Sequence, residues 1–157
     1  MKKLIILIFT ICININVFAQ ANIAAARVLG VGSTVTITGV VTNGDELGPI
    51  RYIEDSTGGM ALYDPTVLAS LVRGDEVTVT GELVDYNGLM EMQPVNSSLV
   101  NSSANSVTPL LITPLQIGET TESELIQIDN VIFNNGGSMF TSGTVSYTHL
   151  RAHETDS

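Results

Sequence analysis

The amino-acid sequence predicts an all-β fold, a small five-stranded barrel with one short helix between its third and fourth strands. Residues 32–39 and 74–81 both alternate apolar side chains with threonine, a period of two that is typical of strands with one buried face. Between these segments, apolar residues recur at helical spacing after an Asp-Pro pair. The Asn87-Gly88 pair then favours a tight hairpin. Together these patterns predict one compact β domain.

The first predicted strand runs from Gly32 into Val41 and would bury one row of side chains, Val35, Ile37 and Val41. Gly39 lies late in this strand, where a small closed barrel needs a sharp bend or a bulge. The glycine-rich residues 30–33 lead into a strand and so lack the helix N-terminus that phosphate-binding loops use. We therefore interpret them as a turn.

Two short apolar runs, residues 50–56 and 60–63, predict the second and third strands, with a tight hairpin connection at residues 57–59. Asp64 then provides a helix cap, and Pro65 suits the first helical position. The apolar residues that follow at helical spacing, up to Gly74, are Val67, Leu68, Leu71 and Val72. This segment predicts the short helix.

The fourth predicted strand continues from Gly74 beyond Gly81, and its buried row would be Val77, Val79 and Leu83. The hairpin at Asn87-Gly88 follows, and residues 89–93 continue as the fifth strand. The order of elements is therefore three strands, one helix and two strands.

That order is the topology of an OB-fold, a five-stranded barrel with its helix between strands three and four. The stretches YIEDSTGGMALY (residues 52–63) and VTVTGELVDYNGL (residues 77–89) resemble the OB-fold-like domains of secreted multidomain proteins of Bacteroidetes, which also occur beside extracellular nucleases. The resemblance covers residues 21–100. It implies an exported OB-fold-like domain and leaves the ligand open.

The N-terminus has the pattern of a secretory signal peptide over residues 1–19. A positive start at residues 1–3 precedes an apolar run at residues 4–13 and a small residue at Ala19. The run is shorter than the roughly 20 residues of a membrane span, so we expect cleavage after Ala19 and no membrane span afterwards. The alternative, lipidation at Cys12, lacks the small residue that should precede the cysteine. We predict a secreted protein, extracellular or on the cell surface.

The remaining chain divides into an OB-fold-like domain at residues 20–100, a linker at 101–111 and the start of a second β module at 112–143. The linker is predicted because the chain turns rich in serine and asparagine from Asn96 onward. In the second module, residues 112–115 would enter a short helix or turn and residues 124–133 alternate like a strand before a turn at residues 134–137. The module would stop before it could close, leaving an exposed edge.

Residues 144–157 form a tail that we expect to be non-native. Residues 144–155 resemble a translated read-through of a sequencing-library adapter. Both histidines of the chain, His149 and His153, lie in this tail. We therefore build no metal or acid–base site from them, although their spacing would place two ligands on one helical face.

The charge balance argues against general attraction to nucleic acid. Between residues 20 and 143, three arginines face fourteen carboxylates, a net charge of −11, and lysine is absent. Non-specific binding to a phosphate backbone depends on clustered Lys and Arg, so a chain this acidic has no such field. The acidity is typical of a soluble exported protein.

Candidate ligand contacts follow from where OB-folds usually bind, on strands two and three and in the loops between strands one and two and strands four and five. A tyrosine there stacks on a base or a sugar, and an arginine pairs with a phosphate or carboxylate. The alternative is that these tyrosines lie at the rim of the barrel, with the ring packed on the core and the hydroxyl exposed to solvent. The candidates are Tyr52, Tyr63, Arg51, Tyr86, Asn87, Asn43 and Asp45.

Catalytic chemistry has no support in residues 20–143, because no His, Cys or Lys is present to activate a nucleophile or ligate a metal. The acidic pairs at residues 45–46, 54–55 and 75–76 match no calcium-loop motif, so we expect no metal and no cofactor. The predicted function is a non-catalytic extracellular binding or scaffolding module for an oligosaccharide, a nucleic acid or a neighbouring domain. The alternative is the accessory N-terminal part of a secreted hydrolase, a nuclease or phosphatase, whose catalytic domain lies beyond Gly143. A third possibility is a purely structural spacer.

Overall fold

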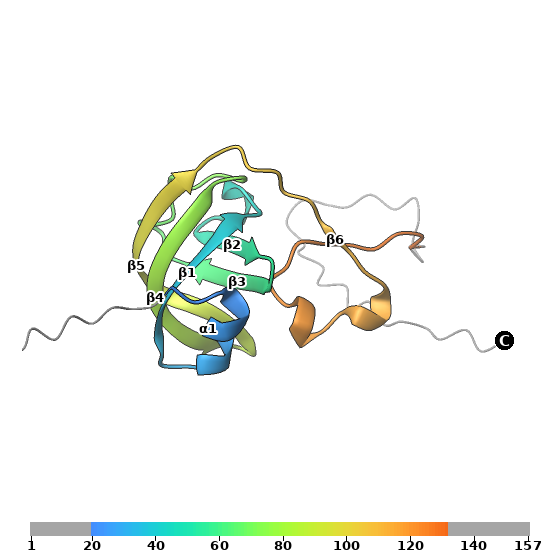
Figure 1. Ribbon diagram of the computed structural model, residues 1–157, viewed down its shortest axis with the longest axis horizontal. Coiled ribbons are helices and arrows are strands. Elements are labelled where there is room, and N and C mark those ends of the chain that lie inside the picture. Colours follow the sequence, from blue (N-terminus) through green and yellow to red (C-terminus); the bar gives the residue numbers. More distant parts are fainter. Residues whose placement is uncertain (1–19, 132–157) are drawn as a thin grey trace, which may run out of the picture.

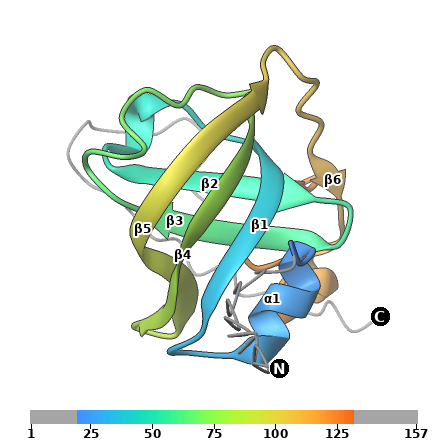
Figure 2. The ribbon, with the colours of Figure 1, turned by 60° about the vertical axis from the view of Figure 1, so that its left-hand side comes forward.

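The computed structural model describes residues 20–131, which contain a closed barrel and a smaller unit beside it (Figure 1). The five strands of the barrel close in the order β1-β2-β3-β5-β4 (Figure 2). All neighbours pair antiparallel except β3 and β5, which pair parallel. The strands are β1 (Thr34–Val41), β2 (Ile50–Asp55), β3 (Gly58–Tyr63), β4 (Glu76–Tyr86) and β5 (Leu89–Ser102). The predicted all-β, five-stranded OB-fold-like barrel is confirmed.

Strand β1 changes partners along its length. It pairs with β4 from Thr34 onward, and its last two residues also pair with β2, where Val40 lies opposite Glu54. At Gly39 a Cβ atom would lie 2.8 Å from the backbone carbonyl oxygen of Glu54, so the close crossing of β1 and β2 needs a glycine there. The glycine at this position is thereby explained by a close approach of two strands, and the β1–β4 register runs through it without a shift.

The barrel interior confirms the predicted strand phasing. The six predicted inward residues are all buried: Val35, Ile37, Val41, Val77, Val79 and Leu83. On the outer face of the same strands, the Thr36 and Thr80 hydroxyls lie 2.8 Å apart and the Thr38 and Thr78 hydroxyls 2.6 Å apart. The threonines that alternate with the core residues thus form cross-strand pairs on the outer face of the barrel.

The helix lies elsewhere than predicted. Helix α1 (Ile23–Leu29) precedes β1, is capped by the Asn22 side chain, which accepts from the Ala25 N–H at 2.7 Å, and buries Ile23 and Ala26 against the barrel. The predicted helix after Asp64 is wrong, because residues 65–70 are a run of turns. The Asp64 carboxylate does cap this run, since it accepts from the N–H groups of residues 66 and 67.

Two other boundaries differ from the prediction. The β2–β3 turn is residues 56–57, so both Gly58 and Gly59 belong to β3. Strand β5 extends to Ser102, well past the predicted end at residue 93, and its serine-rich half pairs with β4, for instance Ser97 with Thr80. The serine and asparagine of residues 96–102 thus reflect a solvent-facing strand, and the connection to the next unit is residues 103–109.

The smaller unit follows at the side of the barrel near α1 and β3 (Figure 1). It contains β6 (Leu110–Leu111), the 3-10 helices η2 (Pro114–Gln116) and η3 (Glu119–Thr121), and β7 (Ile126–Gln127), which pairs parallel with β6. The predicted helix or turn near residues 112–115 is confirmed by η2, whereas the predicted strand at 124–133 contains only β7 within the described part. The expectations for residues 1–19, 134–137 and 144–157 lie outside the described residues.

Within residues 20–131, no helix is long and apolar enough to cross a membrane.

Candidate ligand-binding face of the barrel

The outward face of β2 and β3 brings Tyr52 and Tyr63 together. Tyr52 pairs with Ala61 and Ile50 pairs with Tyr63, while the alternating residues, such as Ile53 and Leu62, fill the core. The two tyrosines are therefore diagonal neighbours on one face, roughly 7 Å apart at their Cβ atoms. Both are partly exposed. We call the outward side of these strands the ligand face; Tyr52, Glu54 and Tyr63 are partly exposed on it, whereas Ala61 and Glu91 on the same side are buried.

Two carboxyl groups belong to this face. Glu91 on β5 pairs in parallel with Ala61, is only 5% exposed, and has its pKa raised by burial. Glu54 pairs with Gly59 and is half-buried. Burial raises the pKa of Glu54, the Leu125 N–H that donates to it has the opposite effect, and the nearby Glu124 carboxylate raises it further. The two tyrosine rings can stack on the apolar face of a ligand ring. The two desolvated carboxyls can accept hydrogen bonds from ligand hydroxyls.

Arg51, predicted to contact ligand, points the other way. It is 2% exposed, and its guanidinium donates to the carbonyl oxygens of Leu71 at 3.0 Å, Gly48 at 2.8 Å and Ile50 at 2.9 Å. The arginine therefore fastens two loops at one end of the barrel, and we correct its predicted role to a structural one. Arg51 lies two residues before Ile53 in the same strand. Because residues two apart in a strand point to the same face, the alternation itself predicts that Arg51 points inward.

Asn43 also holds a loop. Its side-chain oxygen accepts from the Tyr52 N–H at 2.7 Å, and its amide nitrogen donates to the carbonyl oxygens of Ile50 at 3.0 Å and Gly44 at 3.1 Å. The residue is buried, so it positions the β1–β2 loop and the start of the Tyr52 strand. Asn43 can therefore position Tyr52 but offers little surface of its own.

The remaining predicted contacts lie on exposed loops. Asp45 opens the 3-10 helix η1 (Asp45–Leu47) in the β1–β2 loop. Tyr86 is 60% exposed at the end of β4, and Asn87 has a φ of 56° in the β4–β5 turn, a conformation that asparagine tolerates better than most residues. The structure thus joins Tyr52 and Tyr63 on one face and places Asp45, Tyr86 and Asn87 on two different loops.

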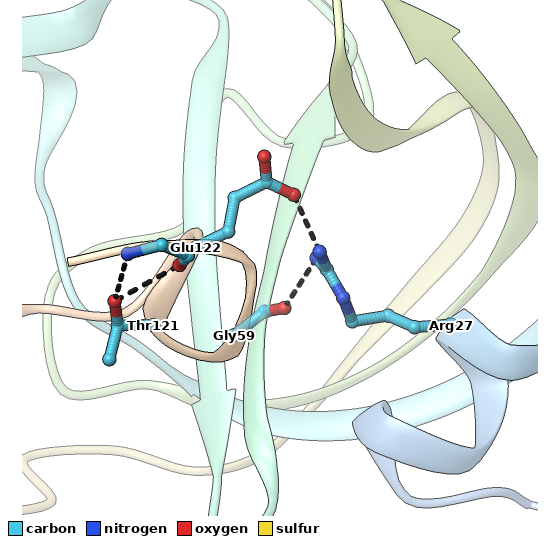
Figure 3. Close-up of polar contacts among 5 residues, drawn as sticks. Arg27, Gly59, Thr121 and Glu122 are labelled. Carbon is cyan, nitrogen blue, oxygen red and sulfur yellow. Dashed lines mark hydrogen bonds and ion pairs between the residues drawn. The ribbon is translucent and has the colours of Figure 1, made fainter. Parts of the chain in front are cut away.

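A segment that the sequence did not single out covers one end of the ligand face. We call residues 118–125 the strap. Arg27 of α1 donates to the Gly59 carbonyl oxygen at 3.3 Å and forms an ion pair with Glu122 of the strap at 2.5 Å (Figure 3). The Leu125 N–H donates to the Glu54 carboxylate. The Ser123 carbonyl lies so close to Gly59 that a Cβ atom there would be 2.3 Å from its oxygen.

Two hollows flank these contacts. One, of about 240 Å³, lies between α1, the start of β3 and the strap, and its lining includes Arg27, Gly59 and Glu122. The other, of about 360 Å³, lies between the facing ends of β1 and β2 and the connection to the smaller unit. Hydroxyl and carboxylate groups line much of the second hollow, whose walls are Val40, Thr42, Glu54, Asp55, Ser56, Ser106, Val107 and Thr108.

Asp55 and Asp75, each from one of the acidic pairs, make structural hydrogen bonds, both within a turn and to distant segments. Asp55 accepts from the Ile23 N–H at 2.8 Å and from the Thr57 N–H at 2.6 Å. Asp75 accepts from the Ser103 hydroxyl at 2.6 Å and the Val72 N–H at 3.0 Å, bonds that hold the pKa of Asp75 below its usual value. Among residues 20–131, no group of three or more His, Cys, Asp and Glu side chains is arranged to hold a metal ion.

The cations of the described region are few and mostly engaged. Arg51 is buried on three carbonyls, and Arg27 is paired with Glu122. Arg73 is exposed in the β3–β4 connection, off the ligand face. Over residues 20–131, the ligand face therefore presents carboxyls and aromatic rings and no arginine of its own.

The fold and the outward face define an OB-fold-like barrel with a candidate ligand surface, and part of the sequence is similar to that of an endonuclease. Over 109 residues the chain is 31% identical to the endonuclease YhcR of Bacillus subtilis (strain 168). The match covers 60% of this chain but only 9% of the endonuclease, so the chain spans less than a tenth of that protein.

Two solved structures align with part of the chain. The hypothetical protein ygiW of E. coli aligns with a TM-score of 0.45 at 15% identity, over 52% of this chain and 89% of that one. An asparaginyl-tRNA synthetase of Entamoeba histolytica aligns with a TM-score of 0.42 at 21% identity, over 56% of this chain and 24% of that one. No family model matches the chain.

Proposed function

We propose that this chain supplies a non-catalytic binding module of a larger exported protein, and that its ligand face binds an uncharged oligosaccharide. One observation carries the proposal: Tyr52 and Tyr63 share an outward face with two desolvated carboxyls, Glu54 and Glu91. Tyrosine rings stack on the apolar faces of sugar rings, and carboxylates are strong acceptors for sugar hydroxyls.

The same chemistry argues against nucleic acid as the ligand. A phosphate backbone would approach two carboxyls on the face, where residues 20–131 place no arginine or lysine to neutralise it. Arg27, which lies beside the face, is already paired with Glu122. An uncharged ligand has no such repulsion to overcome, and the hydroxyl groups that it carries give the carboxyls hydrogen-bond donors.

Titration calorimetry of the whole chain with cello-, xylo- and mannohexaose, and with an oligothymidylate, tests the proposal. We expect a hexasaccharide to bind and Tyr52→Ala or Tyr63→Ala each to weaken it about tenfold, because an aromatic contact contributes roughly 0.5–1.5 kcal/mol beyond the apolar area that it buries. Tyr86→Ala, which removes an exposed tyrosine off the face, is the matched control and should change the affinity little. Binding of the oligothymidylate alone would contradict the ligand class, and binding of none would favour a structural spacer.

A second candidate function follows from the partial match to an endonuclease: the chain would be the accessory front of a secreted hydrolase. Sequencing the source locus across codon 143 with a different library chemistry separates the two. A downstream domain rich in histidine and aspartate would support the hydrolase, whereas further β modules would support a scaffold. N-terminal sequencing of protein recovered from the medium tests export, with Gln20 expected as the first residue.

A further inference from the structure

The strap contacts the barrel and α1 through three separate interactions, one of which reaches the ligand face at Glu54. Its Glu122 pairs with Arg27, its Leu125 N–H donates to Glu54, and its Ser123 carbonyl packs directly on Gly59. The ion pair joins residues from opposite ends of the described chain, ninety-five positions apart. The barrel and the strap are therefore joined by an ion pair, a hydrogen bond to a carboxylate and a close backbone approach.

The same contacts leave the docked strap incompletely satisfied. The Ser123 hydroxyl and one carboxylate oxygen of Glu124 are buried without a hydrogen-bond partner, and each such group opposes docking. Glu124 also lies near the Glu54 carboxyl, a like-charge pair. A hollow of about 240 Å³ remains between the strap, α1 and β3. The unpaired groups and the like-charge pair oppose docking and offset part of what the ion pair and the hydrogen bond contribute.

We propose that residues 118–125 are a releasable strap that closes the Glu54–Gly59 end of the ligand face, so that the face opens fully only when the Arg27–Glu122 ion pair breaks. The gating role rests on the proposed function of this face, whereas the release of the strap does not. In the closed state, the strap occupies Glu54, one of the two carboxyls offered to a ligand. A ligand that needs Glu54 must displace Leu125 and its neighbours.

Gly59→Ala is a selective test of release. The new methyl would collide with the Ser123 carbonyl, and the backbone of Gly59 does not need glycine, since its φ is not in the left-handed region. Gly118→Ala is the matched control, because it adds the same methyl to the strap itself in open space. Hydrogen exchange on the full chain, read by mass spectrometry, reports the opening of each segment separately.

We expect Gly59→Ala to speed exchange of the amides at residues 119–127 by at least about tenfold, while the β1 and β4 amides and the Gly118→Ala variant keep parental rates. Parental protection of residues 119–127 in Gly59→Ala would overturn the proposal. Simultaneous loss of protection in β1 and β4 would overturn it as well, because the strap would then be an integral part of the barrel.

Charge reversal gives a second route that leaves β3 unchanged. Glu122→Arg alone, or Arg27→Glu alone, should release the strap as Gly59→Ala does, and the double variant Arg27→Glu with Glu122→Arg should restore protection. Restoration by the pair distinguishes a lost ion pair from general damage to either element. Failure of both single reversals to open the strap would overturn the role of the ion pair.

The gating is tested by titrating the opened variants with the three hexasaccharides. We expect the affinity of a hexasaccharide that binds the parent to rise severalfold in Gly59→Ala and to stay unchanged in Gly118→Ala. An unchanged affinity in an opened variant would overturn the gating. If the strap opens but no hexasaccharide binds either form, the release stands and the proposed ligand class is what fails.

Discussion

At the scale of single residues, several charged and polar side chains of the barrel are engaged in structural hydrogen bonds to the backbone. Arg51 is fully engaged with three backbone carbonyls, and Asn43 with three backbone groups. Asp55 and Asp75 cap turns and strand ends in the same way. The exposed parts of Tyr52 and Tyr63 are therefore the side chains that the proposed ligand site depends on.

Arg51→Met should destabilise the barrel without weakening oligosaccharide binding. The substitution keeps much of the side-chain volume but leaves three carbonyl oxygens with one donor fewer each, which costs about 3 kcal/mol at roughly 1 kcal/mol per bond. Urea unfolding measures the loss, and calorimetry with a hexasaccharide measures the affinity. A stable variant with a lost affinity would return Arg51 to the ligand site.

Glu54→Gln should stabilise the docked chain at neutral pH. Burial raises the pKa of Glu54, so the folded state binds the proton of this carboxyl more tightly than the unfolded state does. The stability that this difference contributes is fully present below the ordinary pKa of a glutamate carboxyl. That stability is lost as the pH rises through the raised value. Glutamine cannot ionise and keeps an oxygen for the Leu125 N–H.

Thermal melts of parent and Glu54→Gln across the acidic to neutral range check this prediction. The charged groups near Glu54 include Glu124, its sequence neighbour Asp55, and the Arg27–Glu122 pair. We expect the difference between variant and parent to be largest at neutral pH and to shrink as the pH falls. A difference that grows on acidification would show that the charged form of Glu54 is the one that the folded state prefers.

At the scale of elements, the strands could be predicted from the sequence and the helix could not. A period of two in residues 34–41 and 76–83 follows directly from burying one face of a strand. The alternation in the sequence therefore predicts which residues of these strands face the core. The spacing of Leu68 and Leu71 reflects two buried residues in successive turns, and Val72, expected on the same helical face, is 58% exposed. Apolar spacing over so short a segment fits a chain of turns as well as a helix.

The candidate site was predictable only where it depends on strand alternation. Tyr52 and Tyr63 could be placed on the known ligand strands of an OB-fold, and Arg51 could have been excluded by its inward position. The strap could not be found, because the contact between Arg27 and Glu122 joins residues far apart in sequence and no local pattern marks either. The sequence predicts Gly59 as part of a turn, whereas the structure places it in β3, where the Ser123 carbonyl leaves no room for a side chain.

Gly39→Ala should damage the barrel itself, in contrast to Gly59→Ala. The added Cβ would meet the Glu54 carbonyl at 2.8 Å, and both atoms belong to backbone that the closed barrel holds in place. Overpacking of this kind costs about 1–3 kcal/mol, so we expect a lower urea midpoint with an unchanged slope. The hydrogen exchange of the strap amides should not become faster relative to that of the barrel amides. Parental stability of this variant would mean that β1 and β2 can separate without cost.

At the scale of the whole molecule, the charge decides what kind of association is available. Residues 20–131 carry three arginines, two of them engaged, against the same fourteen carboxylates that were counted to residue 143. Such a chain repels polyanions at long range, and salt screens the repulsion. Short-range stacking and hydrogen bonding on the ligand face do not depend on that field.

The affinity for a hexasaccharide should therefore be almost independent of salt. Between about 50 and 200 mM sodium chloride, a protein that neutralises several phosphates loses orders of magnitude in affinity, because binding releases counterions. An uncharged sugar held by Tyr52, Tyr63 and the two carboxyls releases none, so we expect a change of less than about twofold over the same range. Calorimetry at the two salt concentrations measures it, with the oligothymidylate as the charged comparison. A steep fall in affinity with salt would require a cationic surface that residues 20–131 do not offer on this face, and would move the binding site away from Tyr52 and Tyr63.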